Sequence, residues 1–276
     1  MKLAPKQIKE FQNKIFSWWD KNMRDLPWRH THDPYKILIS EVMLQQTQVS
    51  RVITKYREFI ATFPTVGALA KASISDVLKI WKGMGYNRRA LYLKQAAQVV
   101  VERYGEKFPK SEKELIKLPG LGTYTVRALL VFAYKQNVAC VDTNIRRIIT
   151  HFFFDDKPQK PSVIQSVADQ LMPKGKAWEW HQALMDYGAL AMPNAKCQML
   201  NKEKKKTIPF KESNRFYRGR IIDRLREGNI RESMIIREFQ KKYGKSREFM
   251  RSILSGLKND GLLARFAHGT IGLPRG

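Results

Sequence analysis

The chain has 276 residues, 43% hydrophobic and 11% aromatic, which is enough to bury the core of one large or two modest domains without cross-links. Its 51 Lys and Arg against 25 Asp and Glu give a net charge of +26, which favours nucleic acid as the partner over an anionic membrane surface. No run of about 18 apolar residues predicts a spanning helix. No signal-peptide pattern is seen either, so we expect a cytoplasmic, nucleoid-associated protein with no membrane role.

Helical periodicity dominates the first 195 residues. From Pro5 to Asp20 apolar residues recur at helical spacing, and Asp33-Pro34 supplies the N-cap and first-turn residue of a second helix. Few windows alternate as strands do, so residues 1–195 are predicted to form an all-α domain. Its further helices are predicted at 49–63, 65–72, 75–82, 88–104, 111–117, 124–134 and 142–153.

The C-terminal part is more basic. Residues 196–276 hold 21 Lys and Arg against 8 Asp and Glu, a net charge of +13. We predict a basic linker at 196–212 and a small domain at 213–276, with helices at 217–226, 232–243 and 249–259, the last capped by Ser246, and a hairpin of 261–263 with 270–273. Three helices and a hairpin resemble a winged-helix domain, whose third helix would enter a DNA groove. The alternative is an appendage that only covers the first domain.

Two glycine-containing turns between predicted helices are suited to a phosphate. In the stretch 118–122, Leu-Pro-Gly-Leu-Gly, the glycines allow a tight turn with a closely approaching backbone, and the next helix opens with unpaired N–H groups. The stretch 83–86, Gly-Met-Gly-Tyr, has the same shape and precedes two arginines. Residues predicted to bind the DNA backbone are Gly120, Gly122, Thr123, Gly83, Gly85 and Arg88.

Two carboxylates stand out. Glu41 interrupts an otherwise apolar helix, where a carboxylate is either paired or functional. Asp142, in Val141-Asp-Thr-Asn144, opens a helix, and on spacing alone such an aspartate is more often an N-cap than a catalytic group. Two carboxylates in different environments are the raw material for acid catalysis at one and charge stabilisation at the other.

Several motifs together resemble the MutY family of adenine glycosylases, within the helix-hairpin-helix superfamily. They fall in the family's order over most of residues 1–190, and the glutamate block is the most specific of them. The motifs are Leu26-Pro-Trp-Arg29, Pro34-Tyr-Lys36, Glu41-Val-Met-Leu-Gln-Gln-Thr-Gln-Val49, Gly83-Met-Gly-Tyr86, Leu118-Pro-Gly-Leu-Gly-Thr-Tyr-Thr125 and Asp142-Thr-Asn144.

The resemblance implies catalytic roles. Glu41 matches the glutamate that protonates the purine, Asp142 the aspartate that stabilises the oxocarbenium-like sugar, and Asn144 the asparagine beside it. Tyr124 stands where lyase-competent relatives carry a nucleophilic lysine, so hydrolysis without Schiff-base strand cleavage is expected.

The resemblance also implies contacts with a base that must leave the stack before it can be reached. Gln46 and Tyr86 match residues that wedge into the stack, Asp186 matches a carboxylate near the flipped base, and Trp28 and Arg29 match pocket residues. Structural alternatives stay open, since Tyr86 and Trp28 could be core aromatics and Asp186 could cap a helix or pair with an arginine.

The sequence departs from the family pattern in two places. Family members usually carry four cysteines that bind an iron–sulfur cluster, whereas this chain has only Cys140 and Cys197, too few for a cluster or a structural zinc. We therefore expect no metal and no cofactor. The family's Nudix-like C-terminal domain, which recognises 8-oxoguanine, is also not expected, because residues 210–276 are too short and too helical for it.

The predicted function is a monomeric, monofunctional glycosylase that removes adenine opposite guanine or 8-oxoguanine in double-stranded DNA. A neighbouring branch that removes thymine or uracil opposite guanine is the first alternative, since Tyr124, Glu41 and Asp142 fit it too. A non-enzymatic basic DNA-binding protein and a lyase that uses another lysine are the remaining alternatives.

Overall fold

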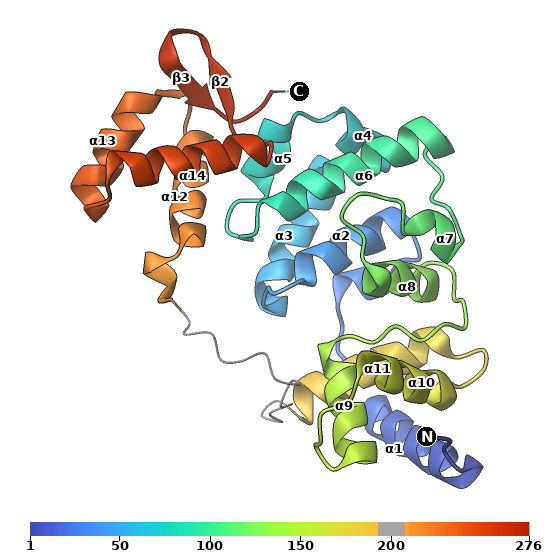
Figure 1. Ribbon diagram of the computed structural model, residues 1–276. Helices are drawn as coiled ribbons and strands as arrows, with labels where there is room; N and C mark the ends of the chain where they lie inside the picture. The colour runs from blue at the N-terminus through green and yellow to red at the C-terminus, as the bar shows by residue number, and fades with distance from the viewer. Residues whose placement is uncertain (193–207, 276) are drawn as a thin grey trace. The chain divides into compact units, whose positions relative to one another are not determined.

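A computed structural model of the chain describes residues 1–192 and 208–275. The chain divides into two compact units, residues 1–41, 109–117 and 121–205 in the first and residues 42–108, 118–120 and 206–276 in the second (Figure 1). The second unit therefore combines an internal segment with the C-terminal region. The predicted linker lies partly outside the described residues, and the predicted domain bounds remain predictions.

The first unit is a helical body. Its helices α1, α9, α10 and α11 pack on one another around Ile15, Ile148 and Trp180, each at most 1% exposed. In α1 the predicted apolar face is confirmed, since Phe11, Ile15 and Trp19 are buried. The elements in this unit are α1 (Pro5–Asn22), η1 (Pro27–Arg29), α2 (Pro34–Leu44, which continues into the second unit), α7 (Glu112–Leu115), α8 (Thr123–Phe132), α9 (Thr143–Phe154), α10 (Pro161–Leu171) and α11 (Ala177–Leu190).

The internal segment of the second unit is also helical. Helix α6 packs on α4 and α5, and Trp81, at the end of α5, is fully buried. Helix α6 ends as sequence predicts, at Gly105 in the left-handed conformation with φ +56°. The helices are α3 (Val49–Thr62), α4 (Val66–Lys71), α5 (Ile74–Ile80) and α6 (Arg88–Tyr104). The prediction that residues 1–195 form an all-α domain is confirmed in its fold class for residues 1–192, and 193–195 lie outside the described residues.

The C-terminal part of the second unit contains the three predicted helices and a small antiparallel sheet in the order β1-β3-β2. The Ser246 hydroxyl accepts the N–H of Phe249 at 3.1 Å and caps α14, as predicted. The winged-helix assignment remains a prediction. The elements are η2 (Phe210–Glu212), α12 (Asn214–Arg226), β1 (Ile230–Arg231), α13 (Glu232–Tyr243), α14 (Arg247–Asn259), β2 (Ala264–Phe266), η3 (Ala267–Gly269) and β3 (Thr270–Gly272).

The predicted hairpin is correct in its second strand and wrong in its first. The structure begins β2 at Ala264, not at 261, because Gly261 takes φ +69° to end α14 and Leu262 and Leu263 are both buried. Two consecutive inward side chains break the alternation of a strand. Strand β1 has only two residues, so its sequence carries no strand signal.

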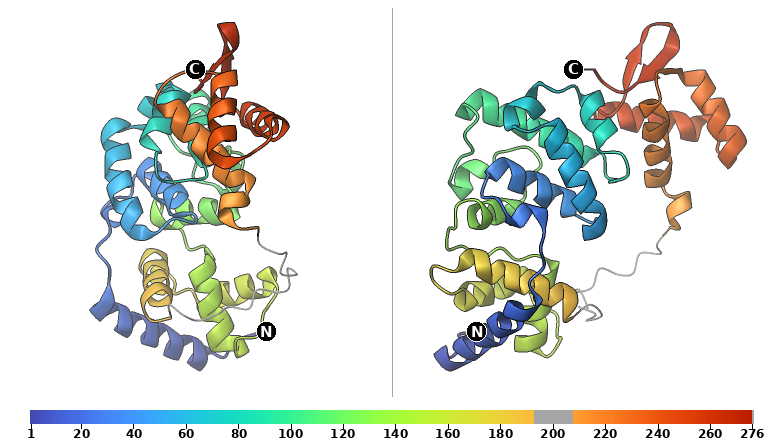
Figure 2. Two further views of the ribbon diagram at one scale, coloured as in Figure 1. Left: turned by 90° about the vertical axis from the view of Figure 1, so that its left-hand side faces the viewer. Right: turned by 180° about the vertical axis from the view of Figure 1, so that it is seen from behind.

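The C-terminal part is bonded to the internal segment within the second unit. The guanidinium of Arg226 in α12 donates to the Leu78 carbonyl at 2.8 Å and to Asn87 Oδ1 at 3.1 Å. The N–H of Ser75 donates to the Pro274 carbonyl at 2.9 Å. Figures 1 and 2 agree in placing α12 beside α5. These bonds explain why residues 206–276 belong to the same unit as 42–108.

Candidate active site

Glu41 is a buried carboxylate in the apolar helix α2. Its side chain lies in a helix whose neighbouring residues Leu38, Ile39 and Val42 are also buried, and the residue is 6% exposed. Burial raises the pKa of Glu41 to about 7, the hydroxyl of Tyr124 donates a hydrogen bond that lowers it, and the charge of Asp142 raises it. Glu41 therefore exchanges a proton near neutral pH, as a general acid or base requires.

Tyr124 is the second residue of α8 and its hydroxyl is bonded to Glu41. Burial, with the charges of Glu41 and Asp142, raises its pKa well above the ordinary value, so the hydroxyl keeps its proton and acts as a donor. The Cys140 thiol nearby also has a raised pKa, mainly through burial, so it is a protonated thiol and a poor nucleophile.

Asp142 caps helix α9. One carboxylate oxygen accepts the N–H of Ile145 at 2.7 Å, and the other accepts a hydrogen bond from Asn144 Nδ2 at 3.1 Å. Burial raises the pKa of Asp142, while these bonds and the charge of Arg147 favour the ionised form. The N-cap expected from sequence is observed, and the same carboxylate lies within electrostatic reach of Glu41.

Two residues that sequence reasoning missed hold Asn144 in place. The guanidinium of Arg147 donates to Asn144 Oδ1 at 3.4 Å and to the carbonyl of Gly188. A Cβ atom on Gly188 would lie 2.6 Å from the Asn144 Cβ, so only glycine lets α11 approach α9 this closely. The signal available in the sequence was a glycine inside a helix, which usually has a packing or functional reason.

His181 fixes the backbone two residues before Asp142. It is 2% exposed; its Nε2 accepts the N–H of Cys140 at 3.0 Å, and its Nδ1 lies 2.7 Å from the Ala177 carbonyl. These partners require a neutral ring with the proton on Nδ1. Burial lowers the pKa of His181 to about 4, in agreement with that tautomer. Sequence reasoning missed this residue as well.

Asp186 is the centre of a buried ionic network. Its carboxylate, with no exposed surface, accepts two hydrogen bonds from Arg29 at 2.8 and 2.7 Å, one from Arg24 Nε at 2.5 Å and one from Trp19 Nε1 at 2.9 Å. Burial alone would raise the pKa of Asp186, but the two arginines outweigh it, so the pKa lies below the ordinary value. Pairing with an arginine, one open alternative for Asp186, is thus observed, and Trp28 is buried. Their roles at a flipped base remain predictions.

The second unit carries the predicted 83–86 turn. Gly83 and Gly85 have φ of +86° and +67°, and Tyr86 has φ +45°, so the turn uses the left-handed conformations that its glycines permit. Arg89, the second of the two arginines after the turn and not predicted as a site residue, bonds this turn to the end of α2. Its guanidinium lies 2.6 Å from the Gln45 carbonyl and 2.9 Å from the Met84 carbonyl.

The residues predicted to enter the DNA stack are both accessible. Gln46 is exposed in the turn after α2 with φ +54°, and Tyr86 is 36% exposed. The Arg88 side chain is 54% exposed and contacts Tyr92 and Asp260. Intercalation and phosphate binding remain predictions for these residues.

The 118–122 turn has the geometry that the sequence predicts. Gly120 has φ +76°, and a Cβ there would lie 2.5 Å from the Tyr92 Cβ, so the position excludes a side chain. Gly122 is the N-cap of α8, and both it and Thr123 are exposed. The N-terminus of a helix favours an anion, so the start of α8 after this turn is suited to a phosphate.

Comparison with known proteins places the chain in a family. Residues 39–174 match the family model of the HhH-GPD superfamily base excision DNA repair protein. A thymine/uracil-DNA glycosylase of Methanothermobacter thermautotrophicus is 34% identical over 199 residues, which cover 70% of this chain and 90% of that protein. The chain belongs to the HhH-GPD superfamily of base excision DNA repair proteins. The helix-hairpin-helix fold that the motifs predicted is therefore confirmed.

Other HhH-GPD relatives are adenine DNA glycosylases. That of Mycolicibacterium smegmatis is 41% identical over 179 residues, and the human one is 35% identical over 196 residues. The matched region covers 64% of this chain and 66% of it, respectively, and spans 61% of the length of the M. smegmatis protein and 36% of the human one.

Solved structures agree on the fold. The structure of a thermostable thymine-DNA glycosylase superposes with a TM-score of 0.63 at 33% identity and covers 70% of this chain and 94% of that one. A non-covalent endonuclease III–DNA complex superposes with a TM-score of 0.60 at 16% identity, which supports the fold alone.

The iron–sulfur cluster that the sequence resemblance implies needs four thiolates, so the two cysteines of this chain do not fit it. Cys140 is buried beside the Glu41 site, and Cys197 lies outside the described residues. Within residues 1–192 and 208–275, no group of three or more His, Cys, Asp or Glu is arranged to hold a metal ion. None of the helices in these ranges combines the length and apolarity needed to cross a bilayer.

Proposed function

We propose that this HhH-GPD member is a monofunctional DNA glycosylase that hydrolyses the N-glycosidic bond of adenine opposite guanine or 8-oxoguanine in double-stranded DNA, without an iron–sulfur cluster. The observation that carries the proposal is the buried Glu41, whose pKa is raised to about 7, with Asp142 within electrostatic reach. A basic binding protein has no use for a carboxylate that titrates at neutral pH inside an apolar helix.

In the proposed reaction, protonated Glu41 gives its proton to the purine while the bond between the base and C1′ of the sugar breaks. The bonding electron pair leaves with the base, and positive charge develops on the sugar. The ionised form of Asp142, favoured by Asn144, the N–H of Ile145 and Arg147, stabilises that charge. Water then adds to C1′ and loses its proton. Tyr124 cannot form a Schiff base, so this route does not cleave the strand.

The excised base is proposed from the relatives. Adenine is favoured by the adenine DNA glycosylases of M. smegmatis, Mycobacterium tuberculosis and human, at 35–41% identity. Thymine or uracil opposite guanine is the second candidate, because the M. thermautotrophicus thymine/uracil enzyme matches over 90% of its length.

Single-turnover excision separates these candidates. Duplexes with one A, T or U opposite G or 8-oxoguanine are incubated with excess protein and then cleaved with alkali. Release of adenine alone supports the proposal. Release of T or U opposite G, without release of adenine, would instead identify the protein as a thymine/uracil glycosylase. No release from any duplex supports a binding protein.

Substitution of Glu41 tests the chemistry. Glu41→Gln removes the exchangeable proton but preserves size, so we expect excision to be abolished and DNA affinity to stay within about twofold of the wild type. Glu10→Gln, on the exposed face of α1, is the matched control and should excise normally. An equal loss of DNA affinity in Glu41→Gln would assign Glu41 a structural role. Borohydride should trap no covalent protein–DNA complex, and efficient trapping would indicate a lyase.

A further inference from the structure

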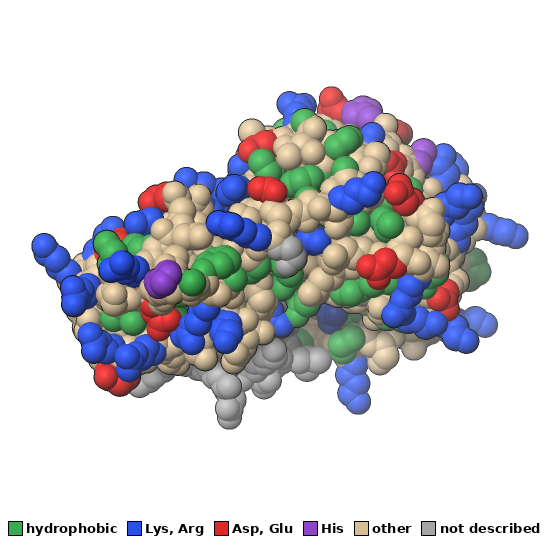
Figure 3. Space-filling view, turned by 90° about the horizontal axis from the view of Figure 1, so that it is seen from above, with side chains coloured by type: hydrophobic (Ala, Val, Ile, Leu, Met, Phe, Trp, Pro, Cys, Tyr) green, Lys and Arg blue, Asp and Glu red, His purple; other side chains and the backbone are tan. Residues whose placement is uncertain are grey.

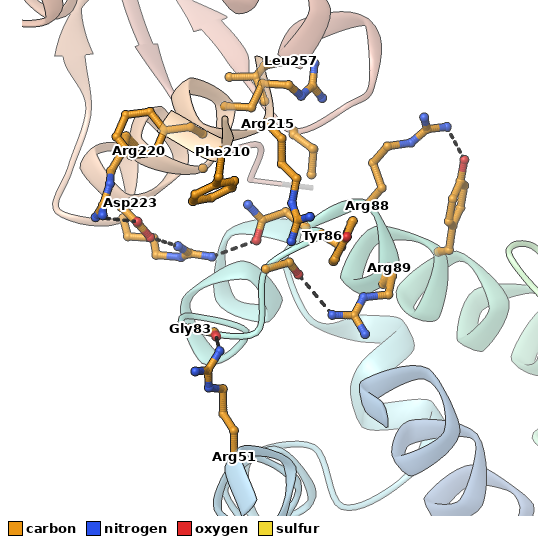
Figure 4. Close-up of a pocket in the computed structure, with 18 residues that line it drawn as sticks. Arg51, Gly83, Tyr86, Arg88, Arg89, Phe210, Arg215, Arg220, Asp223 and Leu257 are labelled. Atoms are coloured by element: carbon orange, nitrogen blue, oxygen red, sulfur yellow. Dashed lines mark hydrogen bonds and ion pairs between the residues drawn. The ribbon is translucent and has the colours of Figure 1, made fainter. Parts of the chain in front are cut away.

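A cavity of about 840 Å³ lies within the second unit, between the 83–92 segment and helix α12 (Figure 4). Its size falls in the range of roughly 300–1,000 Å³ that is typical of small-molecule sites. Seven arginines line it, and Asp223 is the one acidic lining residue. The cavity is thus strongly electropositive. Figure 3 shows that Lys and Arg side chains are also spread over the surface seen from above.

Most of these arginines already have structural partners. Arg226 is bonded to Asp223, to Asn87 and to the Leu78 carbonyl, and Arg218 is paired with Asp260. Arg215 differs from them, because within the described residues it makes neither an ion pair nor a hydrogen bond. Its guanidinium lies instead over two aromatic rings, 3.7 Å from the centroid of Tyr86 and 5.5 Å from that of Phe210.

Tyr86, Arg215 and Phe210 all line the cavity and form one cluster, which we call the stacking platform. Figure 4 shows the three side chains facing one another, from the 83–86 turn and from the start of the C-terminal part. Phe210 is 58% exposed and Tyr86 is 36% exposed. Both rings therefore keep part of their surface open to solvent, where a ligand can reach it.

The two features together match the chemistry of one ligand class. A nucleotide that has left the helical stack offers a flat base, which binds aromatic rings and guanidinium planes, and a phosphate, which binds guanidinium groups. A fully paired duplex offers the phosphates but keeps its base faces covered. The glycines of the 83–86 turn also leave the backbone open, since a Cβ at Gly83 or Gly85 would meet nothing within 4 Å.

We propose that the cavity binds one unstacked nucleotide of the DNA strand, with its base on the stacking platform and its phosphate on the arginines. This nucleotide is additional to the base that Glu41 acts on, because neither Glu41 nor its partners Tyr124 and Asp142 line the cavity. The inference rests on the proposed function to the extent that DNA is the ligand.

The test compares two duplexes that differ by one unpaired nucleotide. Fluorescence anisotropy gives the affinity of the full chain for a paired duplex and for the same duplex with a single bulged cytosine, neither of which contains a mispaired adenine. The wild type should bind the bulged duplex about tenfold more tightly, the effect expected from one base stacked on an aromatic side chain.

Two substitutions isolate the platform. Phe210→Ala removes a ring, and Arg215→Lys keeps the charge but loses the flat guanidinium. Each should reduce the preference for the bulge to within about twofold while affinity for the paired duplex changes little. Arg247→Lys, exposed on α14 away from the cavity lining, is the control and should keep the full preference. Because Phe210 and Arg215 are exposed, thermal unfolding should be unchanged and will verify that the variants fold.

The outcomes separate this inference from the proposed function. A bulge preference that survives both substitutions belongs to another site and overturns the inference, as does equal affinity of the wild type for the two duplexes. An excision assay on the same wild-type preparation tests the proposed function independently. Absence of excision together with a platform-dependent preference would remove the glycosylase proposal and leave the nucleotide site intact.

Discussion

Gly188→Ala should slow base excision by about 100-fold without removing any group that touches the substrate. The added Cβ would lie 2.6 Å from the Asn144 Cβ, whereas atoms in ordinary contact are at least 3.4 Å apart. Asn144 must therefore retreat by about 1 Å, and its 3.1 Å hydrogen bond to Asp142 stretches beyond the range of a hydrogen bond. A misplacement of about 1 Å at a reacting group can cost 10²-fold in rate.

The assay is single-turnover excision with saturating protein, accompanied by DNA affinity and thermal unfolding. Gly67→Ala is the matched control, because its Cβ would come equally close, 2.5 Å, but to the exposed carboxylate end of Glu106, which can move aside. The control should excise at the wild-type rate. A Gly188→Ala protein that folds and excises as fast as the wild type would refute the positioning role of Asn144.

Three further predictions concern the charged groups. Tyr124→Phe removes a hydrogen bond that favours the ionised form of Glu41, so the pKa of Glu41 should rise. The alkaline limb of the pH–rate profile, expected near pH 7 in the wild type, should then move to higher pH. An unchanged alkaline limb would show that it does not report the titration of Glu41. Asp142→Asn should reduce the excision rate by at least about 100-fold while thermal unfolding changes by only a few degrees, because asparagine caps helices as well as aspartate; a large loss of stability would mean that the charge is needed for folding. Asp186→Asn leaves Arg29 buried without its partner and should lower the free energy of unfolding by about 3–5 kcal/mol in denaturant titrations. Since the pKa of Asp186 is lowered on folding, its contribution is present above pH about 4 and is lost as pH falls further, so the variant and the wild type should converge in acid.

The sequence predicted the helices well where local signals define them. Helix α6 was predicted at 88–104 and lies there, because apolar spacing and a terminal glycine both mark it. Strand β1 was not predicted, because two residues are too few to show the alternation of apolar and polar side chains that marks a strand. Its pairing of Ile230 with Ile271 forms only in the folded chain. The bounds of α10 and α11 were likewise not predicted, although the region was expected to be helical.

The candidate site was predictable in its carboxylates but not in their surroundings. Glu41 is conspicuous as a charge in an apolar helix. The roles of Arg147, Gly188 and His181 come from contacts that join residues about 40 positions apart, such as His181 with Cys140. Such contacts are set by helix packing, which a single sequence does not reveal. Asp142 shows a further limit, because the structure confirms its N-cap while its catalytic role remains a proposal.

The discontinuity of the second unit has a consequence for biosynthesis. Residues 42–108 leave the ribosome about a hundred residues before residues 206–276, a delay of roughly 5–20 s at a translation rate of about 5–20 residues per second. During that interval the carbonyl of Leu78 and the side chain of Asn87 lack their eventual donor, Arg226. The nascent chain thus lacks these bonds to Leu78 and Asn87 until Arg226 has been made and has folded against them. We expect this part of the chain to be the point at which chaperones and proteases act on the newly made protein.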